Sequence, residues 1–274
     1  MKYSIKDMKD KLESNSFNFK KKFGQNFIID ENIINGIINK SDIDKDTMVI
    51  EIGPGSGSLT YKLCEYSKNV LCYEIDTTLK DILEDNLSSY DNKKIIFNDF
   101  LKSDVLNDIK DYDYKKLYVV ANLPYYITTP IILKVIESKL DISSMVFMVQ
   151  KEVAERFSAK PKTREYGSIS VFLNYFYNIR NLFTVGKKCF YPVPNVDSAV
   201  IKLEKKDIIL DVDINKFNKV VKDSFQFKRK NLRNNLKNYD IIKIEQLISK
   251  YGFSMNNRAE DLPYEVFVEI ANNL

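Results

Sequence analysis

The sequence predicts an α/β protein built on a doubly wound, mostly parallel, seven-stranded sheet, with a small helical domain after it. Three observations predict this fold. From about residue 47, short apolar runs rich in β-branched residues alternate with stretches of helical period. Polar residues recur at the ends of the first four runs, 23, 25 and 23 residues apart. After residue 206 the signals become helical. Alternating strands and helices are typical of parallel βαβ units.

Seven strands are predicted, each a short apolar run that is β-branched or aromatic in character. They cover residues 47–53, 69–76, 94–100, 116–125, 143–150, 168–179 and 199–206. The predicted helices between them include 59–66, 78–87 and 151–159, and the segments 216–239 and 241–253 are predicted helices of the C-terminal part. These boundaries divide the chain into a basic arm at 1–22, an α/β domain at 23–206 and a helical domain at 207–274.

The composition excludes several kinds of chemistry because the chain contains no histidine. Ser-His-Asp and Cys-His nucleophile systems and histidine-ligated metals are ruled out. The three cysteines, Cys64, Cys72 and Cys189, form no C-x-x-C pair, so we expect neither a disulfide framework nor a metal site. No secretory signal or membrane-spanning run is visible, and a reducing cytoplasm is the expected location.

Four polar residues mark the ends of the first four predicted strands: Glu51, Glu74, Asp99 and Asn122. The carboxyl ends of parallel strands line one edge of a sheet, where ligands bind at the point at which the strand order reverses. We therefore expect these four side chains to converge on one cleft.

The loop after the first strand reads E-I-G-P-G-S-G over residues 51–57. It lacks the G-x-G-x-x-G of dinucleotide sites, because Ser58 occupies the sixth position, and it lacks the G-K-[ST] of a P-loop. An ordinary tight turn is one interpretation. The pattern also resembles motif I of class I S-adenosylmethionine methyltransferases, which implies glycines beside the methionine moiety. Glu74 would then accept both ribose hydroxyls, and Asp99 would accept from the adenine amino group; a helix cap is the alternative for Asp99.

The fourth strand end reads Asn122-Leu123-Pro124-Tyr125 and resembles the [DN]-x-P-[YF] signature of amino-group methyltransferases. An adenine amino group is a poor nucleophile because its lone pair is delocalised into the ring. An Asn oxygen and a backbone carbonyl fixed by the following Pro can accept its two N–H bonds, and Tyr125 can stack on a flipped-out base. A simple strand-ending turn is the alternative interpretation.

Taken in order, these motifs resemble the small-subunit ribosomal RNA adenine dimethyltransferases, the kasugamycin-sensitivity family, from about residue 20 to 237. The matching segments are KKFGQNFIID (21–30), EIGPGSGSLT (51–60), YEID (73–76), NDF (98–100), NLPYYITTP (122–130), QKEVAERF (150–157), EYGSISV (165–171), FYPVPNVDSAV (190–200) and KRKNLRNNLK (228–237). The resemblance implies dimethylation of two adjacent adenosines in the loop of the 3′-terminal hairpin of 16S ribosomal RNA. The expected substrate is an immature 30S subunit, and the enzyme is expected to be a monomer.

The resemblance also implies roles for individual residues. Those implied for the cofactor are Asn26, Ile28, Glu51, Gly53, Gly55, Glu74, Ile75, Asp99, Phe100 and Asn122. Phe190 would cover the target adenine opposite Tyr125, although the residue pattern alone favours a core position for Phe190. The sequence departs from the family pattern at Ile28 (usually Leu), Tyr126 (commonly Asn) and Lys162 (usually Gly).

Basic residues are concentrated in two segments. Residues 219–237 carry seven basic side chains and one acidic, and residues 1–22 carry seven lysines and three acids, whereas the whole chain has a net charge of only +4. Arg229, Arg233 and Lys237 have the i, i+4, i+8 spacing of one helix face. With Lys230, they are the predicted RNA contacts; a solvated face is the alternative.

Three other functions stay open at this point. The macrolide-resistance methyltransferases that act on 23S RNA share several of these motifs. DNA adenine methyltransferases more often carry N/D-P-P-Y and lack the basic C-terminal segment. A factor that keeps the fold without turnover is the third alternative, disfavoured by the intact Glu74, Asp99, Asn122 and Tyr125.

Overall fold

The computed structural model describes residues 25–138, 140–207 and 209–274, so the predicted arm at 1–22 lies outside the described residues. The chain forms two compact units. The first contains the described part of Met1–Lys151 together with Asn181–Leu203, and the second contains Glu152–Arg180 together with Glu204–Leu274. This division differs from the single boundary after residue 206 that the sequence predicts, because Glu152–Arg180 packs with the C-terminal helices.

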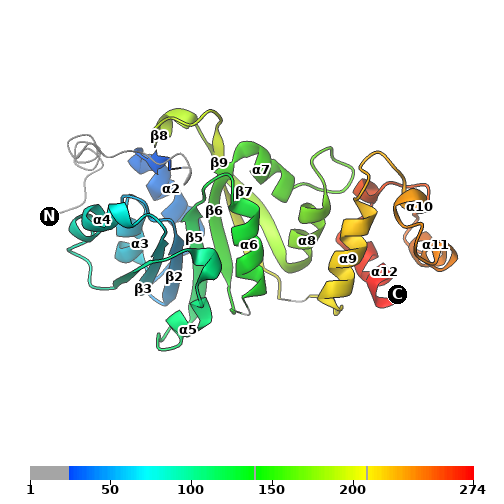
Figure 1. Ribbon diagram of the computed structural model, residues 1–274, viewed down its shortest axis with the longest axis horizontal. Coiled ribbons are helices and arrows are strands. Elements are labelled where there is room, and N and C mark those ends of the chain that lie inside the picture. The colour runs from blue at the N-terminus through cyan, green and yellow to red at the C-terminus, as the bar shows by residue number, and fades with distance from the viewer. Residues whose placement is uncertain (1–24, 139, 208) are drawn as a thin grey trace. The chain divides into compact units, whose positions relative to one another are not determined.

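A seven-stranded sheet, as predicted, has the order β4-β3-β2-β5-β6-β9-β7 (Figure 1). The strands are β2 (Thr47–Ile52), β3 (Asn69–Glu74), β4 (Lys93–Phe97), β5 (Lys116–Asn122), β6 (Ser144–Gln150), β7 (Tyr177–Val185) and β9 (Ser198–Lys205). The pairs β2–β3, β2–β5, β3–β4 and β5–β6 are parallel. The strand order therefore reverses between β2 and β5, which makes their carboxyl ends the expected ligand site.

The central strands are buried on both faces, as in other parallel sheets. All six residues of β2 are buried. Val49 belongs to a core cluster with residues of α2 (Glu31–Ser41), α3 (Thr60–Tyr66) and α4 (Lys80–Asn86). Helix α6 (Thr128–Glu137) buries Ile131, Ile132 and Val135 outside that cluster. Helical cover on both faces confirms the predicted doubly wound class.

A small two-stranded sheet holds the segment before α2. β1 (Phe27–Ile28) pairs antiparallel with β8 (Phe190–Tyr191), with Phe27 opposite Tyr191 and Ile28 opposite Phe190. The Ile29 N–H donates to the Cys189 carbonyl at 2.9 Å. These bonds fix a short segment that the sequence periodicity did not reveal as a strand.

The predicted strand at 168–179 is wrong over most of its length. Residues Ser168–Phe176 form helix α8, and β7 begins at Tyr177. Helix α8 is apolar nearly all round, with Val171, Phe172, Leu173 and Tyr175 all buried. A continuous apolar run of this kind does not distinguish a buried helix from a buried strand.

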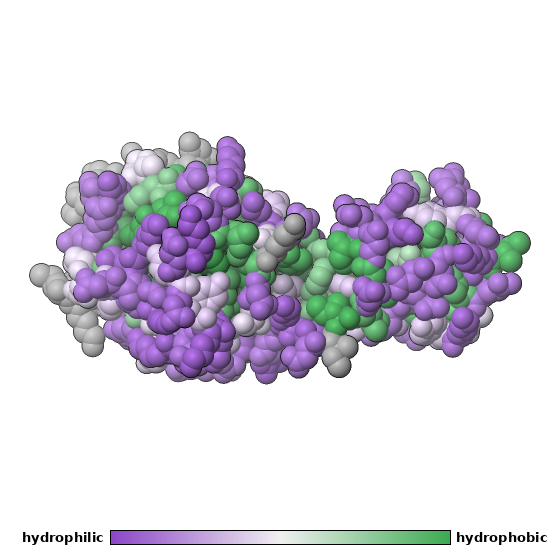
Figure 2. All heavy atoms as spheres, turned by 90° about the horizontal axis from the view of Figure 1, so that it is seen from below, coloured by the Kyte–Doolittle hydropathy of each residue, from purple (hydrophilic) through white to green (hydrophobic). Residues whose placement is uncertain are grey.

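The second unit is helical. Its elements are α7 (Lys151–Phe157, of which Lys151 is assigned to the first unit), α8, α9 (Ile214–Ser224), α10 (Leu232–Asn235), α11 (Ile241–Ser249) and α12 (Tyr264–Asn272), with α12 packed on α8, α9 and α11. In Figure 2, hydrophilic side chains cover much of its visible face, with hydrophobic ones between them.

The predicted continuous helix at 216–239 is also wrong, because α9 ends at Ser224 and α10 has only four residues. The buried side chain of Asn235 holds the intervening turn: its Nδ2 donates to the Ser224 carbonyl at 2.7 Å, and its Oδ1 accepts from the Phe227 N–H at 3.1 Å. Arg229, Arg233 and Lys237 therefore do not lie on one helix face.

Candidate functional site

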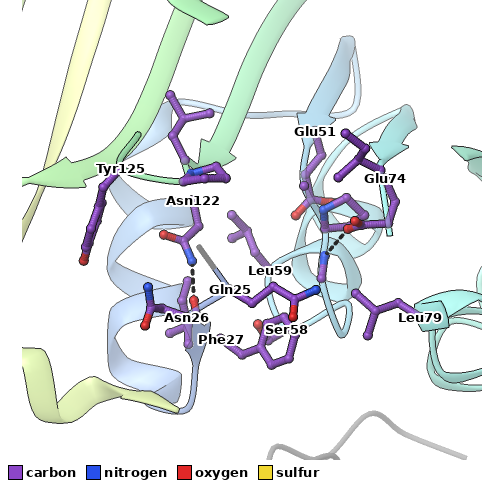
Figure 3. A pocket seen from close by; sticks show the side chains of 17 residues that line it. Gln25, Asn26, Phe27, Glu51, Ser58, Leu59, Glu74, Leu79, Asn122 and Tyr125 are labelled. Carbon is purple, nitrogen blue, oxygen red and sulfur yellow. Dashed lines mark hydrogen bonds between the residues drawn. The ribbon is translucent and has the colours of Figure 1, made fainter. Parts of the chain in front are cut away.

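A pocket lies at the carboxyl ends of β2, β3 and β5, within the first unit. Ligands of open α/β sheets bind at this edge, where the strand order reverses. Eleven of the residues predicted from the sequence line it: Asn26, Ile28, Glu51, Gly53, Gly55, Glu74, Ile75, Asn122, Leu123, Pro124 and Tyr125. Asn122 and Tyr125 lie at one end and Glu51 and Glu74 at the other (Figure 3). The structure thus brings three of the four strand-end residues into one cavity.

Glu74 ends β3 and is 4% exposed. Its Oε2 accepts the Gly55 N–H at 3.0 Å, and its Oε1 accepts the Asp76 N–H at 2.8 Å. These bonds lock the carboxylate between the glycine loop and the turn after β3, while each oxygen keeps further acceptor capacity. Burial raises the pKa of Glu74 to about 6, partly opposed by the backbone N–H donors. Glu74 is therefore a fixed acceptor in its ionised form near neutral pH.

Glu51 lies one strand away, is 2% exposed and also lines the pocket. Its Oε2 is 3.6 Å from the Cys72 Sγ, on the neighbouring position of β3. Burial raises the pKa of Glu51 to about 7. No Lys or Arg is among the described residues that line the pocket. Two carboxyl groups without a cation suit a positively charged ligand better than a phosphate.

The glycine loop leaves room for a ligand against its backbone. Gly53 and Gly55 have φ values of +70° and +60°, which glycine adopts without steric cost. A Cβ at Gly53 would meet nothing within 4 Å, whereas a Cβ at Gly55 would lie 2.7 Å from the Phe27 ring. Gly53 thus opens on free space in the pocket, and Gly55 lets the loop approach β1. This cradle and the fixed Glu74 carboxylate fit the methionine and ribose portions of S-adenosylmethionine.

Asn122 ends β5, and its amide has a defined orientation. Its Nδ2 donates to the Asn26 carbonyl at 2.8 Å. Because a backbone carbonyl only accepts, the amide nitrogen must face Asn26, and the Oδ1 then points toward the side of Tyr125 (Figure 3). The neighbouring Leu123 N–H donates to the Met148 carbonyl at 3.1 Å, which anchors the loop to β6. An acceptor oxygen is therefore held beside an aromatic ring.

The Tyr125 ring is half-buried, and its hydroxyl shares a 2.8 Å hydrogen bond with the Ser198 Oγ. Ser198 begins β9 and is fully buried. Burial also raises the pKa of Tyr125, so the phenol stays neutral. This bond restrains the rotation of the ring and hence the direction of its face.

Three predicted site residues do not line the pocket. Asp99 is the N-cap of a 3₁₀ turn, where its Oδ1 accepts the Leu101 N–H at 3.0 Å and its Oδ2 lies 3.8 Å from the Lys102 Nζ. Phe100 is buried edge-on against Tyr73. Phe190 lies on β8 opposite Ile28 of β1, is 1% exposed and belongs to the hydrophobic core. A core position is what its residue pattern alone favours.

Sequence reasoning did not assign several residues that the structure places in or next to the pocket. The additional lining residues are Gln25, Phe27, Pro54, Ser58, Leu59 and Leu79. Residues 25–28 line the pocket and are called the covering segment. Gln25 donates from its Nε2 to the Asp76 Oδ2 at 2.7 Å, which ties the covering segment to the turn after β3. Gln25 and Phe27 lie in the matching segment KKFGQNFIID, and Ser198 lies in FYPVPNVDSAV. Membership of these segments is the sequence signal that could have identified the three residues.

The predicted RNA contacts Arg229, Lys230, Arg233 and Lys237 are exposed residues of the second unit. Arg233 lies 3.5 Å from Glu245 in an ion pair. No ion pair of Arg229, Lys230 or Lys237 with another described residue is present. In the described part of the chain, no helix has the length and apolar character needed to cross a membrane.

Comparison with known families matches residues 16–274 to the model described as ribosomal RNA adenine dimethylase. The chain belongs to this family. It is therefore an enzyme, an S-adenosylmethionine-dependent RNA methyltransferase that dimethylates adenine in ribosomal RNA. The pocket, the glycine loop and the Asn-Leu-Pro-Tyr motif are accordingly features of an adenine dimethylase.

One curated relative and two solved structures illustrate what this adenine dimethylase is similar to. It is 41% identical over 276 residues to ribosomal RNA small subunit methyltransferase A of Bacillus mycoides (strain KBAB4), covering 97% of this chain and 94% of that protein. Among solved structures, it matches a dimethyladenosine transferase from Plasmodium falciparum with a TM-score of 0.74 at 24% identity, covering 88% and 94% of the two chains. It matches the 23S rRNA methyltransferase ErmE with a TM-score of 0.72 at 25% identity, covering 91% and 99%.

Proposed function

We propose that this adenine dimethylase acts on two adjacent adenosines in the loop of the 3′-terminal hairpin of 16S ribosomal RNA, as a monomer on an immature small subunit. The observation that carries the proposal is the pocket itself, in which the Glu74 carboxylate, the Asn122 amide and the Tyr125 ring share one cavity. The name of the 41% identical relatives supports the small subunit as the substrate.

At the carboxylate end, the chain's own residues bind the cofactor. S-adenosylmethionine supplies a methyl group on a positively charged sulfur. Glu74 accepts from the ribose hydroxyls with the oxygen capacity that its two backbone donors leave over. Gly53 admits the methionine portion, and the buried carboxyl of Glu51, when ionised, adds negative charge to a cavity whose described lining has no Lys or Arg.

At the amide end, Asn122 and Leu123 orient the target. The Asn122 Oδ1 and the Leu123 carbonyl accept the two N–H bonds of the adenine amino group, which favours a pyramidal nitrogen whose lone pair is not delocalised. Tyr125 stacks on the flipped-out base with its ring held by Ser198. No general base is needed before methylation, because the amino nitrogen becomes acidic once methylated and can release its proton afterwards. This suits a chain without histidine.

The second unit supplies RNA contacts in this proposal. Arg229, Lys230 and Lys237 are exposed cations that can replace counterions on RNA phosphates. Arg233 contributes less, because its guanidinium already faces Glu245. Phosphate contacts of this kind give affinity and register, while the pocket selects the base.

Modification of 23S RNA is the competing function, favoured by the structural match to ErmE. Tritiated methyl transfer from S-adenosylmethionine, with undermethylated small subunits and 23S RNA offered as separate substrates, followed by primer extension on each RNA, distinguishes the two. We expect label at two adjacent adenosines near the 3′ end of 16S RNA. Label on 23S RNA alone would contradict the proposal.

The Asn122→Ala variant tests the mechanism in the same assay. We expect methyl transfer to fall by at least about 100-fold, because an oriented acceptor at the reacting group is lost. Cofactor affinity, measured by calorimetry, should be largely spared and fall far less than methyl transfer, since Glu74 and the glycine loop are intact. Transfer at the wild-type rate would rule out the assigned role of Asn122.

A further inference from the structure

Lys162 has a backbone conformation that a lysine rarely adopts. Its φ is +69°, and Asp42 is the other non-glycine residue with positive φ in the described part of the chain. In this left-handed region the Cβ of an L residue crowds the following carbonyl, so glycine is the residue that fits without strain. Strained positions persist where the side chain or the geometry has a use.

The loop that carries Lys162 has a defined shape within the second unit. The Lys162 N–H donates to the Glu260 carbonyl at 2.8 Å. The Thr163 Oγ1 donates to the Lys160 carbonyl at 2.7 Å. Tyr166, which is 2% exposed, packs edge-on against Phe225 with ring centroids 6.3 Å apart. The backbone of this loop is thus fixed while its lysines remain exposed.

A second basic loop lies against it. The Lys228 Nζ donates to the Arg164 carbonyl at 3.3 Å, which brings together two segments 64 residues apart. The two-loop cationic surface consists of Lys160, Lys162 and Arg164 from the first loop and Lys228, Arg229 and Lys230 from the second. All six side chains are exposed, and none forms an ion pair with another described residue.

The surroundings of this surface favour a nucleic-acid partner. Glu165 is exposed in the first loop, and Glu260 lies 3.6 Å from Arg258, so opposing charge is sparse. Phe227, beside the second loop, is 54% exposed and offers a ring on which an unpaired base can stack. Clustered cations with an exposed aromatic ring are the pattern of proteins that track an RNA backbone.

We propose that Lys160, Lys162 and Arg164 form one RNA-phosphate-binding surface with Lys228, Arg229 and Lys230, and that Lys162 occupies its strained position because its ammonium belongs to that surface. This inference rests on the proposed action on ribosomal RNA and extends the contact surface beyond the segment 229–237.

Three substitutions at one position separate charge from strain. Lys162→Gln removes the charge and keeps the Cβ, Lys162→Gly removes both, and Lys162→Arg keeps both. Filter binding of the full chain to undermethylated small subunits and to protein-free 16S RNA, from about 50 to 200 mM salt, measures affinity and its salt dependence. Lys94→Gln, an exposed lysine of β4 in the first unit, is the matched control.

We expect Lys162→Gln and Lys162→Gly to weaken binding to both RNA substrates about eightfold at 100 mM salt and to reduce the slope of log affinity against log salt by about 0.9. Lys162→Arg and Lys94→Gln should retain the wild-type affinity and slope. Lys162→Gly should also melt at a higher temperature than Lys162→Gln, because the strain of the Cβ is gone.

Unchanged affinity and slope in Lys162→Gln would overturn the inference. A loss seen on subunits but not on protein-free RNA would indicate a ribosomal protein as the partner and would overturn it too. Equal melting temperatures for the Gly and Gln variants would remove the argument from strain. Failure of the proposed function is a separate outcome, since the wild-type chain would then transfer no methyl group to 16S RNA.

Discussion

Glu51 is a carboxyl group in the interior of a parallel sheet, 2% exposed, with its pKa raised to about 7 by burial. The folded protein therefore holds a proton on Glu51 more tightly than the unfolded chain does. The contribution of this group to stability is complete below its unfolded pKa near 4.5 and is lost as the pH rises through about 7. Above neutral pH, the fold carries an unfavourable buried charge.

Glu51→Gln should relieve that cost. We expect the variant to be more stable than the wild type by about 3 kcal/mol near pH 8 and by less than about 1 kcal/mol near pH 5. Urea unfolding of the full chain without cofactor at both pH values measures the difference. Glu137→Gln, an exposed carboxylate on α6, is the control and should show no pH-dependent gain. A gain that is equal at both pH values would contradict the titration argument.

The convergence of the strand-end residues could be predicted from the sequence, because their spacing matches the length of one strand plus one helix. Glu51, Glu74 and Asn122 line the pocket as that spacing indicates. The Asn122–Asn26 and Tyr125–Ser198 hydrogen bonds join residues 96 and 73 positions apart. No local pattern encodes such bonds, since they depend on how the loops fold back over the sheet.

At the scale of elements, the glycine loop has two positions that look alike in sequence and differ in surroundings. Gly53 and Gly55 both have positive φ. Free space faces Gly53, whereas the Phe27 ring lies where a Cβ of residue 55 would be. The sequence predicts the conformational need for glycine at both positions but not the approach of Phe27 from β1.

Alanine at each position separates these effects. We expect Gly53→Ala to lower the free energy of unfolding by about 1 kcal/mol through backbone strain. Gly55→Ala should lower it by about 2 kcal/mol more, because Phe27 must move within the core. Chemical denaturation without cofactor measures both. Equal losses in the two variants would mean that the Phe27 contact has no energetic weight.

Two elements show where periodicity fails. Helix α8 is buried nearly all round, so its apolar run carries no helical signature. The basic segment after α9 has the spacing of a helix, but Asn231 caps α10 and Asn235 closes the preceding turn through side-chain bonds. Asn side chains compete with the helical backbone in this way, and their number in N-L-R-N-N was the signal against a continuous helix.

Across the whole molecule, the net charge of +4 hides an uneven distribution. The basic residues of 219–237 belong to the second unit, whereas the described pocket lining in the first unit carries two carboxyl groups and no Lys or Arg. In the proposed function, the second unit therefore contacts phosphates and the pocket of the first unit holds a cationic cofactor. A sequence average cannot report this separation, although segment counts can.

Arg229 and Arg233 test how the second unit uses its charge. Arg229→Ala should reduce the salt slope of 16S RNA binding by about 0.9, because a free guanidinium is lost. Arg233→Ala should reduce it less, since this side chain already pairs with Glu245. Filter binding over a salt series measures both slopes. A larger effect from Arg233 would contradict the ranking that the ion pair predicts.

The hydrogen bond from Asn122 to the Asn26 carbonyl joins the two ends of the pocket. Asn26 lies on the covering segment, which Gln25 ties to Asp76 in the turn after Glu74. The Asn122 amide thus takes its orientation from a backbone segment that is also bonded to the carboxylate end. If the two ends hold the adenine and the methyl donor as proposed, a shift of this segment on binding of one ligand would change the affinity for the other. Thermodynamic linkage then makes that change the same factor in both directions.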